Sequence, residues 1–150
     1  MSFIGYPRTN GQVGARNLIG IVSTVSCAND VALWISQNIE GCVPFLHGQG
    51  CCQTQPDLDI ATRTLISIGC NPNLAGVLLV SLGCESLSVD KILEGISASQ
   101  KPVDKIIIQK DGGAISALAK GCKLAGEMVL DASKIMKQSF SDDNLVIGVK

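Results

Sequence analysis

Aromatic side chains are scarce in this sequence, which has one Trp, one Tyr and three Phe among 150 residues. Hydrophobic residues nevertheless make up 46% of the chain, so its core must be built almost wholly from aliphatic side chains. That composition is typical of a parallel sheet covered on both faces, whose strands read as continuous runs of Val, Ile and Leu. The length fits a single domain of this kind.

An excess of charge of one sign is also missing. Twelve Lys and Arg residues stand against 13 Asp and Glu, the formal net charge is −1, and the basic residues are scattered along the chain. The basic stripe of a nucleic-acid-binding protein and the polybasic patch of a membrane-surface protein are therefore both lacking. We expect partners that are neither nucleic acid nor membrane.

Long hydrophobic runs and a secretion signal are absent too. Residues 74–82 form one of the longest apolar runs, and this run falls far short of the roughly 20 residues that a membrane span needs. The first seven residues lack the charged and apolar regions of a signal peptide. We therefore expect a cytoplasmic protein.

Paired cysteines with metal-ligand spacing do not occur, since no Cys-x-x-Cys pair is present. The seven cysteines are an odd number, and Cys51 and Cys52 are neighbours. This pattern predicts free thiols in a reducing compartment rather than a disulfide framework. Cys42, Cys70 and Cys122 are expected to lie in the core.

Predicted strands and helices alternate four times along the chain. The predicted strands are residues 18–25, 42–46, 76–81 and 103–108, and the predicted helices are residues 30–40, 56–68, 89–98 and 114–137. Asn29 and Ser88 are the expected N-caps of the first and third helices. This alternation predicts an α/β fold with a Rossmann-like, doubly wound and mostly parallel sheet and helices on both faces. Residues 145–149, which follow a polar loop at 139–144, predict a fifth strand.

The N-terminal part of the chain is expected to be a polar segment, residues 1–17, that packs on a single α/β domain, residues 18–150. Its glycines precede a strand, whereas a dinucleotide-binding loop follows a strand and opens a helix. A nucleotide-binding domain is therefore the weakest interpretation. Arg16 in this segment has the fork geometry that matches a substrate carboxylate, although a solvated arginine is the alternative.

Chemically active residue types follow all four predicted strands directly. The four clusters are Ser26-Cys27, residues 47–52, Gly83-Cys84-Glu85 and residues 109–113. Because the carboxyl ends of parallel strands lie along one edge of a sheet, where ligands bind, we expect these clusters to converge. Simple turns are dominated by Gly, Pro, Asn, Asp and Ser, whereas these clusters add Cys, His, Glu and Gln. The sequence therefore predicts a functional site at this edge.

Individual residues of these clusters keep more than one interpretation. His47, the only histidine, is the strongest candidate for metal or proton chemistry near neutral pH. Glu85 is either a base or ligand, or an acidic residue favoured near a helix N-terminus. Cys27 is either a ligand or a small buried side chain. Cys51 and Cys52 cannot easily point into one site together because they are adjacent.

Taken together, the motifs resemble those of the altronate/galactarate dehydratase family, which includes the large subunit of sulfolactate sulfo-lyase. The matching residues are Gly5-Tyr6-Pro7-Arg8, residues 11–17, residues 21–27, Val43-Pro44, His47-Gly48-Gln49-Gly50-Cys51, Leu82-Gly83-Cys84-Glu85, Gln109 and Gly112-Gly113. The chain departs from the family at Asn10-Gly11-Gln12, where Asp-Gly-Arg is usual. It also departs at Cys52, where Gly is frequent, and at Ala114, where Thr or Ser is frequent.

The resemblance implies the central domain of a larger enzyme that removes water from a small sugar acid by β-elimination, giving a 2-keto-3-deoxy acid. It implies dependence on a divalent metal, iron(II) or manganese(II), because a metal stabilises the charge of the intermediate. The implied partners are the remaining domains or a partner subunit, in a homo-oligomer, with the fragment alone inactive. The implied site residues are His47 and Glu85 for catalysis, Arg16, Asn17, Gln109, Gly112 and Gly113 for substrate binding, and His47, Cys27, Cys51 and Cys84 for the metal.

Three alternatives to this function remain open. The chain is either part of the active site or a non-catalytic scaffold that dimerises the enzyme. Sulfolactate is an alternative substrate, with sulfonate leaving in place of water. An iron–sulfur cluster on Cys27, Cys51 and Cys84 is a further alternative, because cluster ligands are thiolates.

Overall fold

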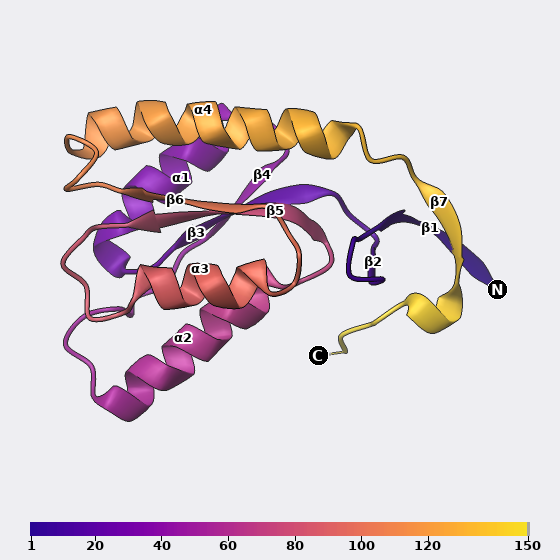
Figure 1. Ribbon diagram of the computed structural model, residues 1–150, viewed down its shortest axis with the longest axis horizontal. Helices are drawn as coiled ribbons and strands as arrows, with labels where there is room; N and C mark the ends of the chain where they lie inside the picture. Colours follow the sequence, from indigo (N-terminus) through magenta and orange to yellow (C-terminus); the bar gives the residue numbers. More distant parts are fainter. Residues whose placement is uncertain (150) are drawn as a thin grey trace.

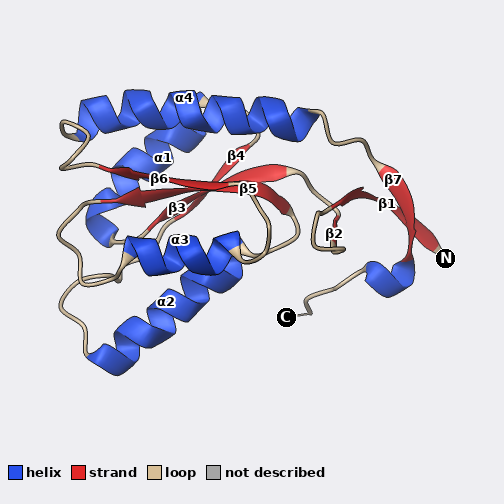
Figure 2. Ribbon diagram, viewed as in Figure 1, coloured by secondary structure: helices blue, strands red, loops and turns tan. Residues whose placement is uncertain are grey.

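The computed structural model describes residues 1–149 and contains a parallel α/β layer structure beside a small antiparallel sheet (Figures 1 and 2). The parallel sheet has the order β4-β3-β5-β6. Its strands are β3 (Leu18–Ser23), β4 (Cys42–Phe45), β5 (Leu74–Ser81) and β6 (Val103–Ile107), and its helices are α1 (Asn29–Asn38), α2 (Gln55–Gly69), α3 (Val89–Ser97) and α4 (Ala114–Ser133). A short 3-10 helix, η1 (Ser26–Ala28), precedes α1.

Helices cover both faces of this sheet, which confirms the predicted α/β arrangement. Helices α1 and α4 lie on one face, and α2 and α3 lie on the other (Figure 1). All eight residues of β5 are buried, and they alternate between the two layers. Leu78 and Val80 pack with the α1–α4 layer, whereas Val77 and Leu79 pack with the α2–α3 layer. Both cores are aliphatic, as the composition predicts.

The strand order fixes where the chain reverses direction across the sheet. In chain order the four strands lie 2-1-3-4, so the reversal falls between β3 and β5. This differs from the 3-2-1-4-5-6 order of the Rossmann dinucleotide fold, and the Rossmann-like part of the prediction is not confirmed. Among the helices of residues 1–149, none combines the length and apolar character required to cross a membrane.

The predicted fifth strand is wrong, because within residues 1–149 the parallel sheet has four strands. Residues 145–149 adopt no strand, and Val146 and Val149 are 92% and 94% exposed. The segment before them, expected to be a loop, contains β7 (Gln138–Ser141), which pairs with the N-terminal strand. Because β7 pairs with β1, the chain after it lies away from β6. Residues 145–149 have high strand propensity, but no strand of the described residues pairs with them.

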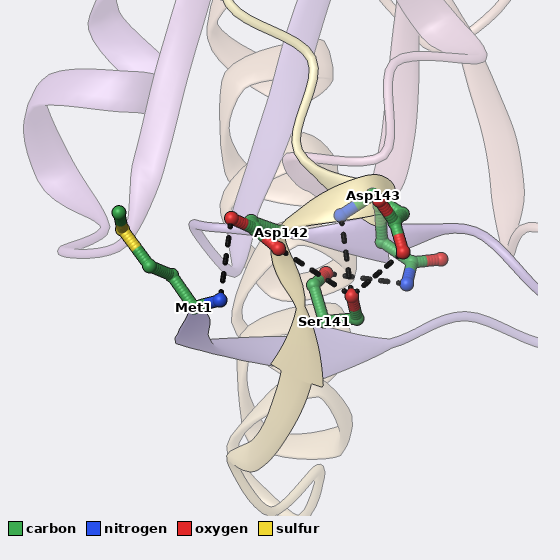
Figure 3. Close-up of polar contacts among 5 residues, drawn as sticks. Met1, Ser141, Asp142 and Asp143 are labelled. Atoms are coloured by element: carbon green, nitrogen blue, oxygen red, sulfur yellow. Dashed lines mark hydrogen bonds and ion pairs between the residues drawn. The ribbon is translucent and has the colours of Figure 1, made fainter.

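The N-terminal segment forms strands rather than only a polar cover. Strand β1 (Ser2–Pro7) pairs antiparallel with β2 (Val13–Gly14) and with β7. Figure 3 shows the N-terminus beside η2 (Asp142–Asn144), a 3-10 helix that follows β7. The Met1 ammonium lies 3.6 Å from a carboxylate oxygen of Asp142. Arg8 then joins this sheet to the α/β layers, since its Nε donates to the Pro72 carbonyl at 2.7 Å.

Candidate functional site

The carboxyl ends of the parallel strands form one edge of the molecule, on the side opposite the antiparallel sheet (Figure 1). We define the carboxyl-edge loops as residues 24–28, 46–54, 82–87 and 108–113. The structure brings all four together through backbone hydrogen bonds. Ser26 N donates to Gln49 O, Ser86 N donates to Gly50 O, and Gln109 N donates to Leu82 O, each at 3.0 Å. The loop after β3 leads to α1 on one face of the sheet, and the loop after β5 leads to α3 on the other face. Ligands of doubly wound sheets bind in the crevice between two such loops.

Gly50 lies where the backbones of two of these loops approach each other closely. Its φ is +114°, and a Cβ built there would lie 2.6 Å from the Thr24 carbonyl oxygen and 2.7 Å from Val25 Cα. Only glycine combines that backbone angle with that contact. The loop carrying His47 is therefore laid directly on the backbone that follows β3.

His47 is half-buried, and both of its ring nitrogens contact backbone groups. Nε2 lies 2.9 Å from Ser23 O, and the backbone N–H of Gln49 donates to Nδ1 at 3.1 Å. The His47 carbonyl accepts a hydrogen bond from Asn29 Nδ2 at 3.0 Å. The only histidine of the chain is therefore held at three points, by the end of β3, by the start of α1 and by its own loop.

Glu85 occupies the reversal point between β3 and β5. Its Oε1 accepts from Thr24 Oγ1 at 2.6 Å and from Ser81 Oγ at 2.5 Å, and its Oε2 accepts from Gly83 N at 2.6 Å. Burial acts to raise the pKa of Glu85, but the hydrogen bonds from Ser81, Thr24 and the backbone outweigh it and hold the pKa below its usual value. The carboxylate is ionised near neutral pH and both of its oxygens are engaged.

The exposed cysteines all lie in the carboxyl-edge loops. Cys27, Cys51, Cys52 and Cys84 are exposed free thiols, whereas the other three cysteines are half-buried. Cys84 Sγ accepts a hydrogen bond from Gln109 Nε2 at 3.4 Å, which links the loops after β5 and β6. Cys42 and Cys122 pack against the core of the α1–α4 layer, as predicted. Cys70 lies outside both core clusters, with its Sγ 3.9 Å from the Gly95 carbonyl of α3.

The residues predicted to bind metal do not form a metal centre by themselves. In the part of the chain that the structure describes, no group of three or more His, Cys, Asp or Glu side chains is placed to hold a metal ion. Both ring nitrogens of His47 and both carboxylate oxygens of Glu85 already take part in hydrogen bonds within the chain. The donor set of these residues therefore does not fit a metal held by this chain alone, and it does not fit a three-thiolate cluster site.

Two of the predicted substrate-binding residues lie at the opposite edge of the sheet. Arg16 and Asn17 precede β3, so the length of that strand, about 20 Å at roughly 3.3 Å per residue, separates them from His47. Asn17 accepts from Arg8 Nη1 at 2.8 Å and donates to Ala132 O at 2.7 Å, and Arg16 is exposed. The structure does not bring this pair together with the carboxyl-edge loops.

The other predicted substrate-binding residues lie where α4 begins. Gln109 is exposed, and Gly112 and Gly113 have φ of +85° and +91°, a region that favours glycine. No side chain caps the N-terminus of α4, and its first turn holds no acidic residue. These first backbone N–H groups and the helix dipole favour an anion there.

A cleft of about 810 Å³ lies beside His47, between edge strand β4 and helix α2. His47, Gln49 and Cys52 line one part of it, and apolar side chains such as Phe45 and Ile60 line another. Sequence patterns did not indicate this cleft, because it depends on where α2 packs. The contacts of Thr24, Ser81 and Asn29 were missed as well. The signal for the first two was a hydroxyl at the end of an otherwise apolar strand.

Comparisons with known proteins give one family match and three partial relatives. The family model described as D-galactarate dehydratase/altronate hydrolase, second domain, matches residues 5–133. The (2R)-sulfolactate sulfo-lyase subunit beta of Chromohalobacter salexigens is 41% identical over 78 residues, which cover 52% of this chain and 20% of that protein. The altronate dehydratases of Escherichia coli and Bacillus subtilis are 37% and 31% identical over 85 and 88 residues. Those matches cover 49% and 52% of this chain.

The matched parts are small portions of the relatives. The chain spans 17–20% of the length of these curated proteins. No solved structure matches the chain.

Proposed function

Because the chain belongs to the D-galactarate dehydratase/altronate hydrolase family, matching its second domain, we propose that it forms one wall of the active site of a sugar-acid dehydratase. The observation that carries this proposal is the convergence of the four carboxyl-edge loops at the reversal point of the sheet. The reaction is the β-elimination of water from an aldonate or aldarate. We also propose that the enzyme works in the cytoplasm, since seven free thiols fit a reducing compartment.

The chemistry of this elimination requires anion binding and proton transfer. A base removes the proton next to the substrate carboxylate, the β-hydroxyl leaves with a proton as water, and the enol becomes a 2-keto-3-deoxy acid. Negative charge grows on the carboxylate, and fixed donors aimed at it stabilise the intermediate. We assign this binding to the uncapped N-terminus of α4, with Gln109, Gly112 and Gly113 beside it.

His47 is the proposed group for proton transfer, because it is the only side chain of these loops whose ordinary titration range lies near neutral pH. The N–H of Gln49 donates to its Nδ1. Because Gln49 is an exposed loop residue, this bond can open when Nδ1 takes up a proton. The catalytic role predicted for Glu85 stays a prediction. Its three hydrogen bonds and lowered pKa favour a structural role over that of a base.

A divalent metal, when bound, supplies Lewis-acid stabilisation of the substrate oxygens. Since the residues described here do not fit a metal centre alone, we propose that most ligands for iron(II) or manganese(II) come from outside this chain. The chain spans about a fifth of its relatives, so the remaining domains of the enzyme or a partner subunit are the proposed source. The substrate-binding role predicted for Arg16 and Asn17 stays a prediction, since both lie at the opposite edge of the sheet.

The experiment uses a complete dehydratase containing this domain, assayed anaerobically with iron(II) or manganese(II) on altronate and galactarate. His47→Ala is expected to lower kcat by at least about 100-fold, the usual contribution of a positioned acid or base. Gln37→Ala, a change at an exposed position of α1, is the control and should retain turnover. Normal turnover by His47→Ala would remove the catalytic assignment.

Two alternatives are each favoured by one observation. The hydrogen bonds of His47 and Glu85 within the chain favour a non-catalytic scaffold domain that dimerises the enzyme. In that case His47→Ala and Gln37→Ala both keep full turnover. The 41% identity to a sulfolactate sulfo-lyase subunit favours sulfolactate as the substrate. Release of sulfite from sulfolactate, without turnover of altronate or galactarate, would establish that second alternative.

A further inference from the structure

Asn29 is the residue that connects the end of β3 to the loop carrying His47. We infer that Asn29 is a positioning residue that holds the backbone of His47 where its ring meets Ser23 O and the Gln49 N–H, and through these two contacts sets the orientation and the tautomer of the ring. The inference rests on the proposed function for the importance of His47, but its structural content stands on hydrogen bonds alone. Three bonds close a ring through Ser23, Asn29 and His47.

The orientation of the Asn29 amide follows from its partners. The His47 carbonyl only accepts hydrogen bonds, so Asn29 must turn its NH₂ group toward it, at 3.0 Å. The amide oxygen then faces Ser23 Oγ, which donates to it at 2.5 Å. Ser23 is fully buried at the end of β3, so this hydroxyl is a rigid anchor for the amide.

The tautomer of His47 follows by the same reasoning. A backbone N–H only donates and a backbone carbonyl only accepts. Nδ1 therefore carries no proton where it meets the Gln49 N–H, and Nε2 carries the proton that it donates to Ser23 O. Proton uptake by the ring has to occur at Nδ1, and it breaks the bond from Gln49.

The choice of Asn over Asp at this position supports a role beyond starting the helix. Asn29 is the first residue of α1, where a negative charge is favoured by the helix dipole. Its side chain bonds to Ser23 Oγ and to the His47 carbonyl rather than to a backbone N–H of α1, and Asp30 already supplies the acidic residue of the first turn. An aspartate at 29 keeps the acceptor for Ser23 but has no proton for the His47 carbonyl. The donor is therefore the property that position 29 requires.

The test is nitrogen-15 NMR of the 150-residue chain, because a single histidine makes the ring signals unambiguous. At a pH where the ring is neutral, the wild type should show a protonated Nε2 and a bare Nδ1. Asn29→Asp releases the His47 backbone, and loss of the bond from Nε2 to Ser23 O, which only this tautomer makes, should lower the ratio of this tautomer to the other about fivefold. Asn38→Asp makes the same chemical change at the exposed end of α1, where Asn38 bonds locally to Trp34 O, and should leave the ratio unchanged.

Two results would overturn the inference: a wild-type ring protonated at Nδ1, or a wild-type tautomer ratio in Asn29→Asp. Ser23→Ala supplies a second variant if Asn29→Asp does not fold, since it removes the anchor of the amide, together with a longer contact of 3.4 Å to Phe45 O, and should shift the ratio in the same direction. None of these measurements depends on turnover. A failed dehydratase assay with the expected spectra would therefore reject the proposed function and leave the positioning role intact.

Discussion

Cys52 adopts a backbone conformation that suits glycine. Its φ is +56°, in the left-handed region. A side chain in this region costs roughly 1–2 kcal/mol, because Cβ crowds the following carbonyl. The chain therefore bears a conformational cost at Cys52, beside the cleft next to His47.

Cys52→Gly is therefore expected to raise the free energy of unfolding by about 1 kcal/mol, measured by urea denaturation. Gln100→Gly is the matched variant, since Gln100 has a φ of +60° in the connection after α3, far along the chain from Cys52. It should gain a similar amount. A gain at position 100 with a loss at position 52 would mean that the Cys52 side chain makes stabilising contacts that outweigh its backbone strain.

Glu85 gives a prediction about acid sensitivity. Its folded-state pKa is below the ordinary value, so its ionised form stabilises the fold above that ordinary value. The contribution is lost as the pH falls through the folded pKa. Glu85→Gln keeps an acceptor for Thr24 and Ser81 but turns an NH₂ toward Gly83 N, and should lower the free energy of unfolding by about 1–3 kcal/mol at pH 7.

The measurement is urea denaturation of wild type and Glu85→Gln from pH 7 down to below the ordinary pKa of glutamate. The difference between the two should shrink as the pH falls, because protonation removes the advantage of the carboxylate. Glu94→Gln, at an exposed position of α3, controls for the loss of one charge. A difference that stays constant over the whole range would mean that the ionised state of Glu85 is not what stabilises the loops.

Helices α1 and α4 approach each other closely through a small residue of α4. A Cβ at Gly121 would lie 2.3 Å from Cδ1 of Ile35 and 3.1 Å from Cδ1 of Ile106, and both of these side chains are fully buried. A Cβ at Gly126, on the same helix, meets nothing within 4 Å. The two glycines have the same helix propensity but opposite surroundings.

Gly126→Ala is expected to raise the free energy of unfolding by about 1 kcal/mol through helix propensity alone. Gly121→Ala gains the same propensity but overpacks the layer, which typically costs 1–3 kcal/mol, so its net effect should be neutral to destabilising. Thermal and urea denaturation of both variants measure the contrast. Equal stabilisation by the two alanines would show that α1 and α4 pack less tightly than the distances indicate.

The elements of the α/β layers were predictable because their signals are local. Each of the four strands and the first three helices was placed to within two residues at both ends, since apolar runs and helical spacing mark them directly. Ser88 was also correct as the N-cap of α3, where it accepts from Lys91 N. Asn29 was wrong as a cap, because η1 inserts before α1 and makes Ala28 the N-cap.

The antiparallel sheet was not predictable from such signals. Strand β7 is short and polar, and it becomes a strand because β1 lies beside it, a pairing across almost the whole chain. Residues 145–149 show the converse, with strong strand propensity and no partner. At the site, topology predicted which loops meet, whereas the bonding of His47 and Glu85 depends on side-chain directions that residue spacing does not encode.

The molecule as a whole carries His and Cys side chains that could bind metal, but among residues 1–149 they form no metal centre. The effect of added metal on thermal stability tests this. A metal at 100 times its dissociation constant would stabilise a folded chain by about 2.7 kcal/mol. For a domain of this size that corresponds to a rise of roughly 5–10 °C in the unfolding midpoint. If the ligands come mainly from elsewhere in the enzyme, iron(II), manganese(II) and a chelator should each leave the midpoint of the 150-residue chain unchanged within about 1 °C.

The titration is done anaerobically with a thiol reductant, so that the exposed cysteines stay reduced, and His47→Ala is scanned beside the wild type. A rise of several degrees in the wild type that His47→Ala abolishes would place a metal on the imidazole, and the hydrogen bonds of His47 to Ser23 and Gln49 would then have to open on binding. A rise that persists in His47→Ala would point to the thiols instead. We expect no rise in either protein and metal-dependent turnover of the complete enzyme, because the described residues form no metal centre by themselves. That result would mean that this domain holds the substrate while another part of the enzyme binds the metal.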